Sequence, residues 1–154
     1  MGDVSETPKD NGWVMTEESA TPELVELVRE QVEALNRGDL DGVMSDVTED
    51  AVLDGRVEVV EGRAAIRDFL EEWFSVYEGL DFELEEVSHL GGGVVFAVVI
   101  QDGRLVGGGH LRQREGWVYL CVGGLIAALT TRSDPGEARA AAERLAQDRS
   151  LRQA

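Results

Sequence analysis

The hydrophobic period of this chain changes from that of a helix to that of a strand near Gly79, and this change limits what the chain can fold into. Before Gly79, apolar residues recur every three to four positions, the spacing of one helix face. Residues 23–77 therefore predict a helix, a short helix, a short strand and a long helix. After Gly79 the spacing falls to two, which is typical of strands. Helices first and consecutive antiparallel strands afterwards predict the α+β class.

The predicted ends of the first two helices depend on four residues. Residues 1–20 have no apolar period and are predicted to be a mobile tail. Thr21 suits the N-cap of the first helix, and Pro22 suits its first position, where a backbone N–H is not needed. Gly38 can adopt the left-handed conformation that ends this helix, and Asp39 is the predicted cap of the next.

Two further helices lie on either side of the strand region. The third helix is predicted over residues 63–77, and Gly79 is predicted to end it. An alanine-rich helix is predicted over residues 136–149. The chain is thus expected to form one domain over residues 21–133, followed by a C-terminal helix and a frayed tail over residues 134–154.

Glycine pairs and triplets divide the strand region. Gly91–Gly93 and Gly123–Gly124 predict turns, and the Asp102-Gly103 pair predicts a further hairpin. Residues 94–100 are apolar throughout, which indicates a central strand buried on both faces. Residues 105–122 are too long for one flat strand, so bends are expected at Gly107–Gly109 and at Gly116.

Charge and cysteine content exclude several functions. The formal net charge of −17 would repel nucleic acids and anionic membranes, so neither is an expected partner. No apolar run approaches the roughly 18 residues of a membrane span. Cys121 is the one cysteine, which rules out an internal disulfide and predicts a reducing cytoplasm. Its apolar surroundings favour a buried, inert thiol over a nucleophile.

Four short segments together resemble the nuclear transport factor 2-like superfamily. They are residues 32–42 (VEALNRGDLDG), 50–53 (DAVL), 61–69 (EGRAAIRDF) and 123–126 (GGLI). Each is weak alone, but their order and spacing are specific, and the match covers about residues 22–132. Within the superfamily the chain is most similar to the SnoaL-like branch and the ketosteroid isomerases.

The resemblance implies a cone: a curved antiparallel sheet wrapped around three helices that enclose an apolar pocket. It also implies a homodimer formed through the convex face of the sheet. The superfamily contains isomerases, cyclases, epoxide hydrolases, dehydratases and non-catalytic binding modules, so the fold leaves function open. Three hypotheses follow: a protein that binds a small apolar or aromatic molecule, a cyclase, isomerase or hydratase that needs no cofactor, or an interaction module with a filled pocket.

The residues that ketosteroid isomerases use are largely missing. Gln31 occupies the position of their tyrosine on the first helix, and Gly116 that of the aspartic acid that donates to the oxyanion. Their base falls at Gly55, one residue after Asp54, which leaves Asp54 as the candidate base. Thr131 occupies the position of the epoxide hydrolase aspartate on the last strand, which counts against that activity.

If Gly116 faces the pocket, period two places three basic side chains on the same side: His110, Arg112 and Arg114. Arg112 would then bind an acidic oxygen, and His110 would move a proton near neutral pH. The candidate catalytic residues are accordingly Asp54 and His110.

The candidate ligand-binding residues are Gln31, Trp73, Tyr77, Arg112 and Arg114. Every candidate except Gln31 also has a structural interpretation. The arginines suit ion pairs with surface carboxylates and the aromatic residues suit the core. For the two catalytic candidates the alternatives are a turn for His110 and a loop or cap for Asp54. Two histidines without a cysteine cluster give no metal-binding spacing, and neither glycine triplet precedes a helix as a phosphate loop does. No metal or organic cofactor is predicted.

Overall fold

The structure is a computed structural model that describes the backbone of residues 15–55 and 57–153 and the side chains of residues 23–55 and 57–152. Its elements in chain order are α1 (Met15–Arg37), α2 (Leu40–Ser45), β2 (Val47–Asp54), β3 (Val59–Glu61), α3 (Arg63–Ser75), β4 (Tyr77–Gly91), β5 (Val94–Leu105), β6 (His110–Val122), β7 (Leu125–Arg132) and α4 (Pro135–Gln153). No helix among these residues is long and apolar enough to cross a membrane.

Six strands form one sheet in the order β3-β2-β7-β6-β5-β4, and the predicted α+β class is confirmed. The expectation of a purely antiparallel sheet was wrong at one pair, because β2 runs parallel to β7. The reason is topological: β2 precedes the long third helix and the other strands, and a long connection allows the last strand to return beside it in the same direction.

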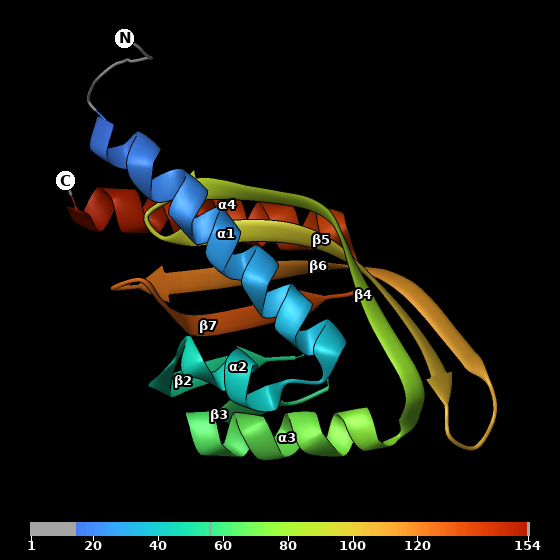
Figure 1. Ribbon diagram of the computed structural model, residues 1–154. Coiled ribbons are helices and arrows are strands. Elements are labelled where there is room, and N and C mark those ends of the chain that lie inside the picture. The colour runs from blue at the N-terminus through green and yellow to red at the C-terminus, as the bar shows by residue number, and fades with distance from the viewer. Residues whose placement is uncertain (1–14, 56, 154) are drawn as a thin grey trace, which may run out of the picture.

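Helices cover both faces of the sheet (Figure 1). Helices α1, α2 and α3 pack on the face that we call concave, whereas α4 packs on the opposite, convex face across β4 to β7. Strands β4, β5 and β6 bend together at one end, beyond the tips of the helices (Figure 1). Strand β5 lies between the two layers, and residues 94–99 are buried at every position, as predicted for a central strand.

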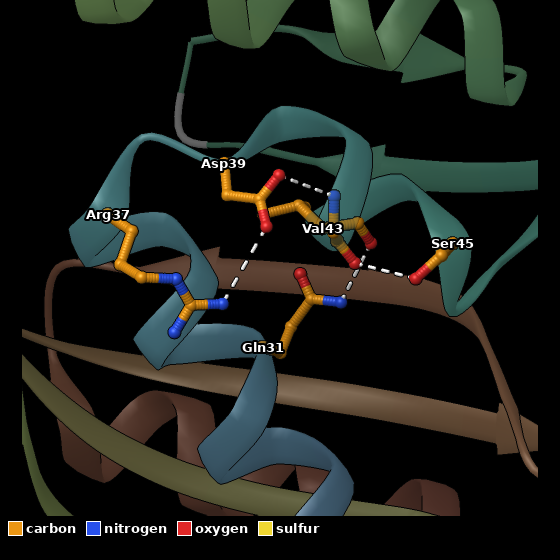
Figure 2. A network of polar contacts seen from close by, with 6 residues as sticks. Gln31, Arg37, Asp39, Val43 and Ser45 are labelled. Carbon is orange, nitrogen blue, oxygen red and sulfur yellow. Dashed lines mark hydrogen bonds and ion pairs between the residues drawn. The ribbon is translucent and has the colours of Figure 1, made fainter.

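The junction between α1 and α2 is built as the sequence predicted. Gly38 has a φ of +69°, and the Asp39 side chain accepts a hydrogen bond from the Gly42 backbone N–H at 3.0 Å (Figure 2). Arg37 lies 3.7 Å from the Asp39 carboxylate in the same view. This capped turn fixes the position of α2 at the closed end of the cone.

Two predicted helix ends were wrong. Helix α1 begins at Met15, so Pro22 lies inside it rather than at its first position, and Thr21 does not cap it. The part of the predicted tail that covers residues 1–14 lies outside the described residues. Helix α3 ends at Ser75 instead of residue 77, and Tyr77 is the first residue of β4.

One predicted hairpin was also wrong. Strand β5 continues through Asp102 and Gly103 to Leu105, and the chain turns at residues 106–109 instead. The turns at Gly91–Gly93 and Gly123–Gly124 are confirmed, with positive φ at all five glycines. The Asp102-Gly103 pair therefore lies within a paired strand, where Gly103 faces Leu111 of β6.

Candidate functional site

A cavity of about 380 Å³ lies between the concave face of the sheet and α1, α2 and α3. Its wall is mostly aliphatic and aromatic. The residues that line it include Gln31, Ala51, Leu53, Gly55, Val57, Glu58, Trp73, Tyr77, Gln101, Leu111, Glu115, Trp117, Tyr119, Ile126, Leu129 and Thr131. Such a wall, apolar with a few polar groups, is typical of small-molecule sites.

Strand register shows how the cavity runs from its mouth to its inner end. At the mouth, Val57 is 91% exposed, and Thr131 of β7 pairs with Trp117 of β6. Further in, Leu129 pairs with Tyr119, which is 1% exposed. Innermost is Ile126, which is 4% exposed. The cavity therefore follows β6 and β7 inward from the loop between β2 and β3.

Glu115 and Gln101 are buried polar residues of this wall that the sequence prediction missed, and Glu115 carries the charge. It is 5% exposed, and its two carboxylate oxygens accept from different donors. The Trp117 indole N–H donates to one oxygen at 2.9 Å, and the Gln113 side-chain amide donates to the other. These donors fix the orientation of the carboxylate in the cavity wall.

The sequence prediction missed Glu115 because it assigned β6 the wrong phase. It placed Gly116 toward the cavity, but Gly116 faces α4, where an added Cβ would overlap Ala138 and lie 2.9 Å from the Pro135 Cα. Successive side chains on a strand point to opposite faces, so a phase error of one residue exchanges the inner and outer sets. Leu111, Glu115, Trp117 and Tyr119 face the cavity instead.

The three basic residues of β6 consequently lie on the outer side. His110 Nε2 is 2.6 Å from Asp102 Oδ1, and an Arg112 nitrogen is 2.8 Å from Asp102 Oδ2. Arg114 pairs with Glu85 at 2.6 Å, and all three basic side chains are exposed. Hydrogen bonds from His110 and then Arg112 hold the pKa of Asp102 below its ordinary range. The expected orientation of these three side chains toward the pocket was wrong. They pair with surface carboxylates instead.

Asp54 also lies outside the cavity wall, although its neighbour Gly55 is part of it. The Asp54 carboxylate is 3.2 Å from a guanidinium nitrogen of Arg132, and its side chain is 40% exposed. Asp54 ends β2 next to Thr130 of β7, so the ion pair closes the ends of these parallel strands. The carboxylate thus forms a structural ion pair and is not among the groups that line the cavity.

The other three candidates line the cavity. Gln31 is 5% exposed and donates to the Val43 carbonyl at 3.0 Å, which joins α1 to α2 (Figure 2). Trp73 and Tyr77 meet edge to face, with ring centroids 6.4 Å apart. Tyr77 in turn contacts buried Gln101, whose amide N–H donates to the tyrosine hydroxyl at 3.4 Å. Their role toward a ligand stays a prediction.

Two buried groups near the inner end of the cavity have raised pKa values. Burial raises the pKa of the Cys121 thiol to about 11, which keeps it protonated and supports an inert cysteine. Burial also raises the pKa of the Tyr119 hydroxyl well above its ordinary value. Within the described residues no group of three His, Cys, Asp or Glu side chains is arranged to hold a metal ion.

Solved structures of similar fold come from several bacteria. An NTF2-like protein of unknown function from Burkholderia pseudomallei matches 75% of this chain and 93% of its own, with 17% identity and a TM-score of 0.67. A putative polyketide cyclase from Xanthomonas campestris matches 79% and 97%, with 23% identity and a TM-score of 0.63. A Mycobacterium tuberculosis protein, solved in complex with estradiol-17beta-hemisuccinate, matches 73% and 94%, with 15% identity and a TM-score of 0.65. At these identities the likeness establishes the fold.

No curated protein matches this sequence significantly. A family model does: the SnoaL-like domain matches residues 28–129, more than half of the chain and nearly all of the cone. The resemblance found in the sequence is thereby confirmed. This chain belongs to the SnoaL-like domain family of the NTF2-like superfamily.

Proposed function

We propose that this protein binds a small, largely apolar molecule in the cavity between the concave face of the sheet and α1, α2 and α3. The observation that carries the proposal is the cavity itself, about 380 Å³ of space with an apolar wall. Natural interiors are close-packed, so a void of this size is expected to have a use. The same space argues against the interaction module with a filled pocket.

Aromatic residues favour a flat ligand. Trp73, Tyr77 and Trp117 lie in the wall of the cavity. Aromatic rings attract one another edge to face and in offset stacks, beyond the area that they bury. The Mycobacterium tuberculosis relative, crystallised with a steroid ester, supports a ring compound as the class of ligand.

Probe binding tests this proposal. Naphthalene and 2-acetylnaphthalene are small ring compounds whose binding raises the melting temperature of a protein that holds them, in proportion to RT ln(1 + [L]/Kd). We expect both to raise it. Ala51 is 2% exposed in the cavity wall, so Ala51→Leu should fill the space and weaken both probes at least tenfold. No shift with either probe in the wild type would refute the proposal.

Glu115 favours a second candidate, acid–base catalysis without a cofactor. A carboxylate that is held by two donors in an apolar wall has the fixed geometry that a general base needs. Glu115 would replace Asp54 and His110, which lie outside the cavity wall, in the mechanism proposed for an isomerase or cyclase. The step would be removal of a proton next to a carbonyl group, giving an enolate that takes a proton back at the same or another carbon.

Hydrogen exchange tests this candidate without knowledge of the substrate. In D₂O a base that removes a methyl proton of 2-acetylnaphthalene leads to its replacement by deuterium, which NMR detects. We expect exchange above the buffer rate in the wild type and none above it in Glu115→Gln. Probe binding without faster exchange would leave the binding function and remove the catalytic one.

The net charge bears on which partners the protein can have, and the covered face of the sheet bears on how it could dimerise. We propose a cytoplasmic protein that has no nucleic-acid or membrane partner, because a net charge of −17 repels both. For the expected homodimer we propose a revised surface, since α4 lies over the convex face of β5 and β6. A dimer would have to use the outer side of α4 or the sheet edges, and light scattering of the purified chain would establish its mass.

A further inference from the structure

Position 103 is occupied by glycine although its backbone conformation does not require one. It lies within β5, pairs with Leu80 on one side and Leu111 on the other, and does not have a left-handed φ. Glycine inside a strand weakens that strand, so its presence indicates that something approaches closely. A Cβ added here would lie 2.6 Å from Tyr77 Cδ1, 2.7 Å from Tyr77 Cε1 and 3.0 Å from Leu80 Cδ1. The Tyr77 ring thus lies directly against the Gly103 backbone.

Two other contacts hold the same ring. Trp73 meets Tyr77 at an interplanar angle of 87°. Gln101, two residues before Gly103 on β5 and 3% exposed, donates its amide N–H to the Tyr77 hydroxyl in a long hydrogen bond of 3.4 Å. A hydroxyl that accepts from an amide still has its own proton to donate. Tyr77 therefore has a fixed ring and a free donor function at the cavity wall.

We propose that Tyr77 selects ligands with an uncharged oxygen acceptor, such as a ketone, and that Gly103 is the positioning residue that makes this possible. The inference rests on the proposed binding function and adds the ligand class. An uncharged oxygen is specified because an anion would lose its hydration in an apolar cavity, which costs more than one phenol hydrogen bond returns. Tyr77, Gln101 and Leu111 all line the cavity, and Leu111 pairs with Gly103 across β5 and β6.

Matched probes measure the selection directly. 2-Acetylnaphthalene has a ketone oxygen and naphthalene has none, so the ratio of their dissociation constants reports the hydrogen bond and cancels the shared ring contacts. We expect the wild type to bind the ketone about tenfold more tightly, the strength of one good hydrogen bond. Tyr77→Phe keeps the ring and should abolish this preference while naphthalene affinity changes less than twofold. Arg114→Gln, on the exposed outer side of β6, is the control and should keep the wild-type ratio.

A double-mutant cycle tests the part played by Gly103. Gly103→Ala should displace the ring and remove the ketone preference, whereas in a Tyr77→Ala background the same change should have no further effect on the ratio. Stability gives a second measure, because alanine suits a strand better than glycine does. Gly103→Ala should lower the melting temperature alone and leave it unchanged or raise it beside Tyr77→Ala. If Gly103→Ala alone does not fold, recovery of folding by Tyr77→Ala supports the proposal.

The outcomes separate this inference from the proposed function. If the wild type binds neither probe, the binding function is refuted. If the wild type binds both and Tyr77→Phe keeps the ketone preference, or if no preference exists, the cavity binds ligands and Tyr77 does not select them. If Gly103→Ala lowers stability equally with and without Tyr77, then Gly103 does not act through that ring.

Discussion

The two faces of the sheet are packed in opposite ways. On the convex face, Ala138, Ala142 and Ala146 lie one helical turn apart along α4, and their contact with the sheet is so close that Gly116 has no room for a Cβ. On the concave face, three helices with large side chains leave a cavity of about 380 Å³. Small residues thus give the tight layer and large residues give the open one.

The contrast between the tight convex layer and the open concave layer shows that this sequence has enough apolar residues to pack closely. A shortage of them does not explain the cavity. Strand β6 serves both layers, with Trp117 and Tyr119 toward the cavity and Val118 toward α4. The same strand that packs without gaps on one side borders open space on the other. Because close packing is available to this sequence, the open side is best understood as a site.

Removal of α4 is the most severe test of the tight layer. A chain that ends at Ser133 would expose Val94, Phe96, Val98 and Val118, which are at most 4% exposed in the whole protein. At about 1.5 kcal/mol for each side chain, the loss is roughly 6 kcal/mol, comparable to the whole stability of many domains. We expect aggregation or a new dimer, measured by light scattering and urea unfolding. A soluble monomer with unchanged stability would show that α4 is dispensable.

Adding carbon atoms to each face compares the layers directly. Gly116→Ala adds one methyl group that overlaps Ala138, so α4 must shift, and we expect a loss of about 2 kcal/mol in the free energy of unfolding. Ala51→Leu adds three carbon atoms toward the cavity and should cost less than about 1 kcal/mol. Urea unfolding of the two variants measures both. A larger cost for Ala51→Leu would mean that the concave side is also closely packed.

Much of the fold could be predicted because local chemistry determined it. Gly38 and Asp39 end one helix and cap the next through contacts within a few residues, and the Gly91–Gly93 and Gly123–Gly124 turns need only a positive φ. The Asp102-Gly103 pair has the same local signal, but Tyr77 lies against Gly103 within a strand. At Gly103 this tertiary contact, which the local sequence pattern does not reveal, outweighs the preference of an Asp-Gly pair for a turn.

The site was harder to predict because burial on both faces removes the alternation that fixes strand phase. Residues 117–121 of β6 are apolar at every position, since α4 covers one side and the cavity wall forms the other. Nothing in that run distinguishes inward from outward, and the phase assigned through Gly116 was off by one. Glu115 was therefore missed. Trp73 lies in the cavity wall on α3, where the helix period is clear, whereas Tyr77 reaches the same wall from the first position of β4 and not from the predicted helix.

The inner end of the concave layer should make the protein sensitive to alkali. The folded pKa of Cys121 is about 11, above its ordinary value of 9.0, because burial disfavours the thiolate. Stability from this group is fully present below pH 9 and is lost as the pH rises to 11, since the unfolded chain gives up the proton first. At pH 10.5 the loss is about 2 kcal/mol.

Urea unfolding at pH 8 and pH 10.5 checks this value, with Cys121→Ala as the comparison. The variant should lose about 2 kcal/mol less than the wild type over this interval, whatever its stability at pH 8. Tyr119, whose pKa burial also raises, titrates in both chains and cancels. Equal losses in the two chains would indicate that water reaches Cys121 and that the inner end of the concave layer is wet.

The smallest effects are expected at the polar residues outside both layers. Asp54 is 40% exposed and pairs with Arg132 at 3.2 Å, so Asp54→Asn should change the free energy of unfolding by less than about 1 kcal/mol. It should leave the affinity for 2-acetylnaphthalene and any deuterium exchange of that probe unchanged, because Asp54 does not reach the cavity wall. Glu115→Gln, on β6 of the same sheet, should abolish the exchange that Asp54→Asn leaves intact. If Asp54→Asn instead stopped the exchange and Glu115→Gln did not, Asp54 would be the base and would reach the ligand through the mouth of the cavity. The assignment of Glu115 to catalysis and of Asp54 to a structural ion pair would then be wrong.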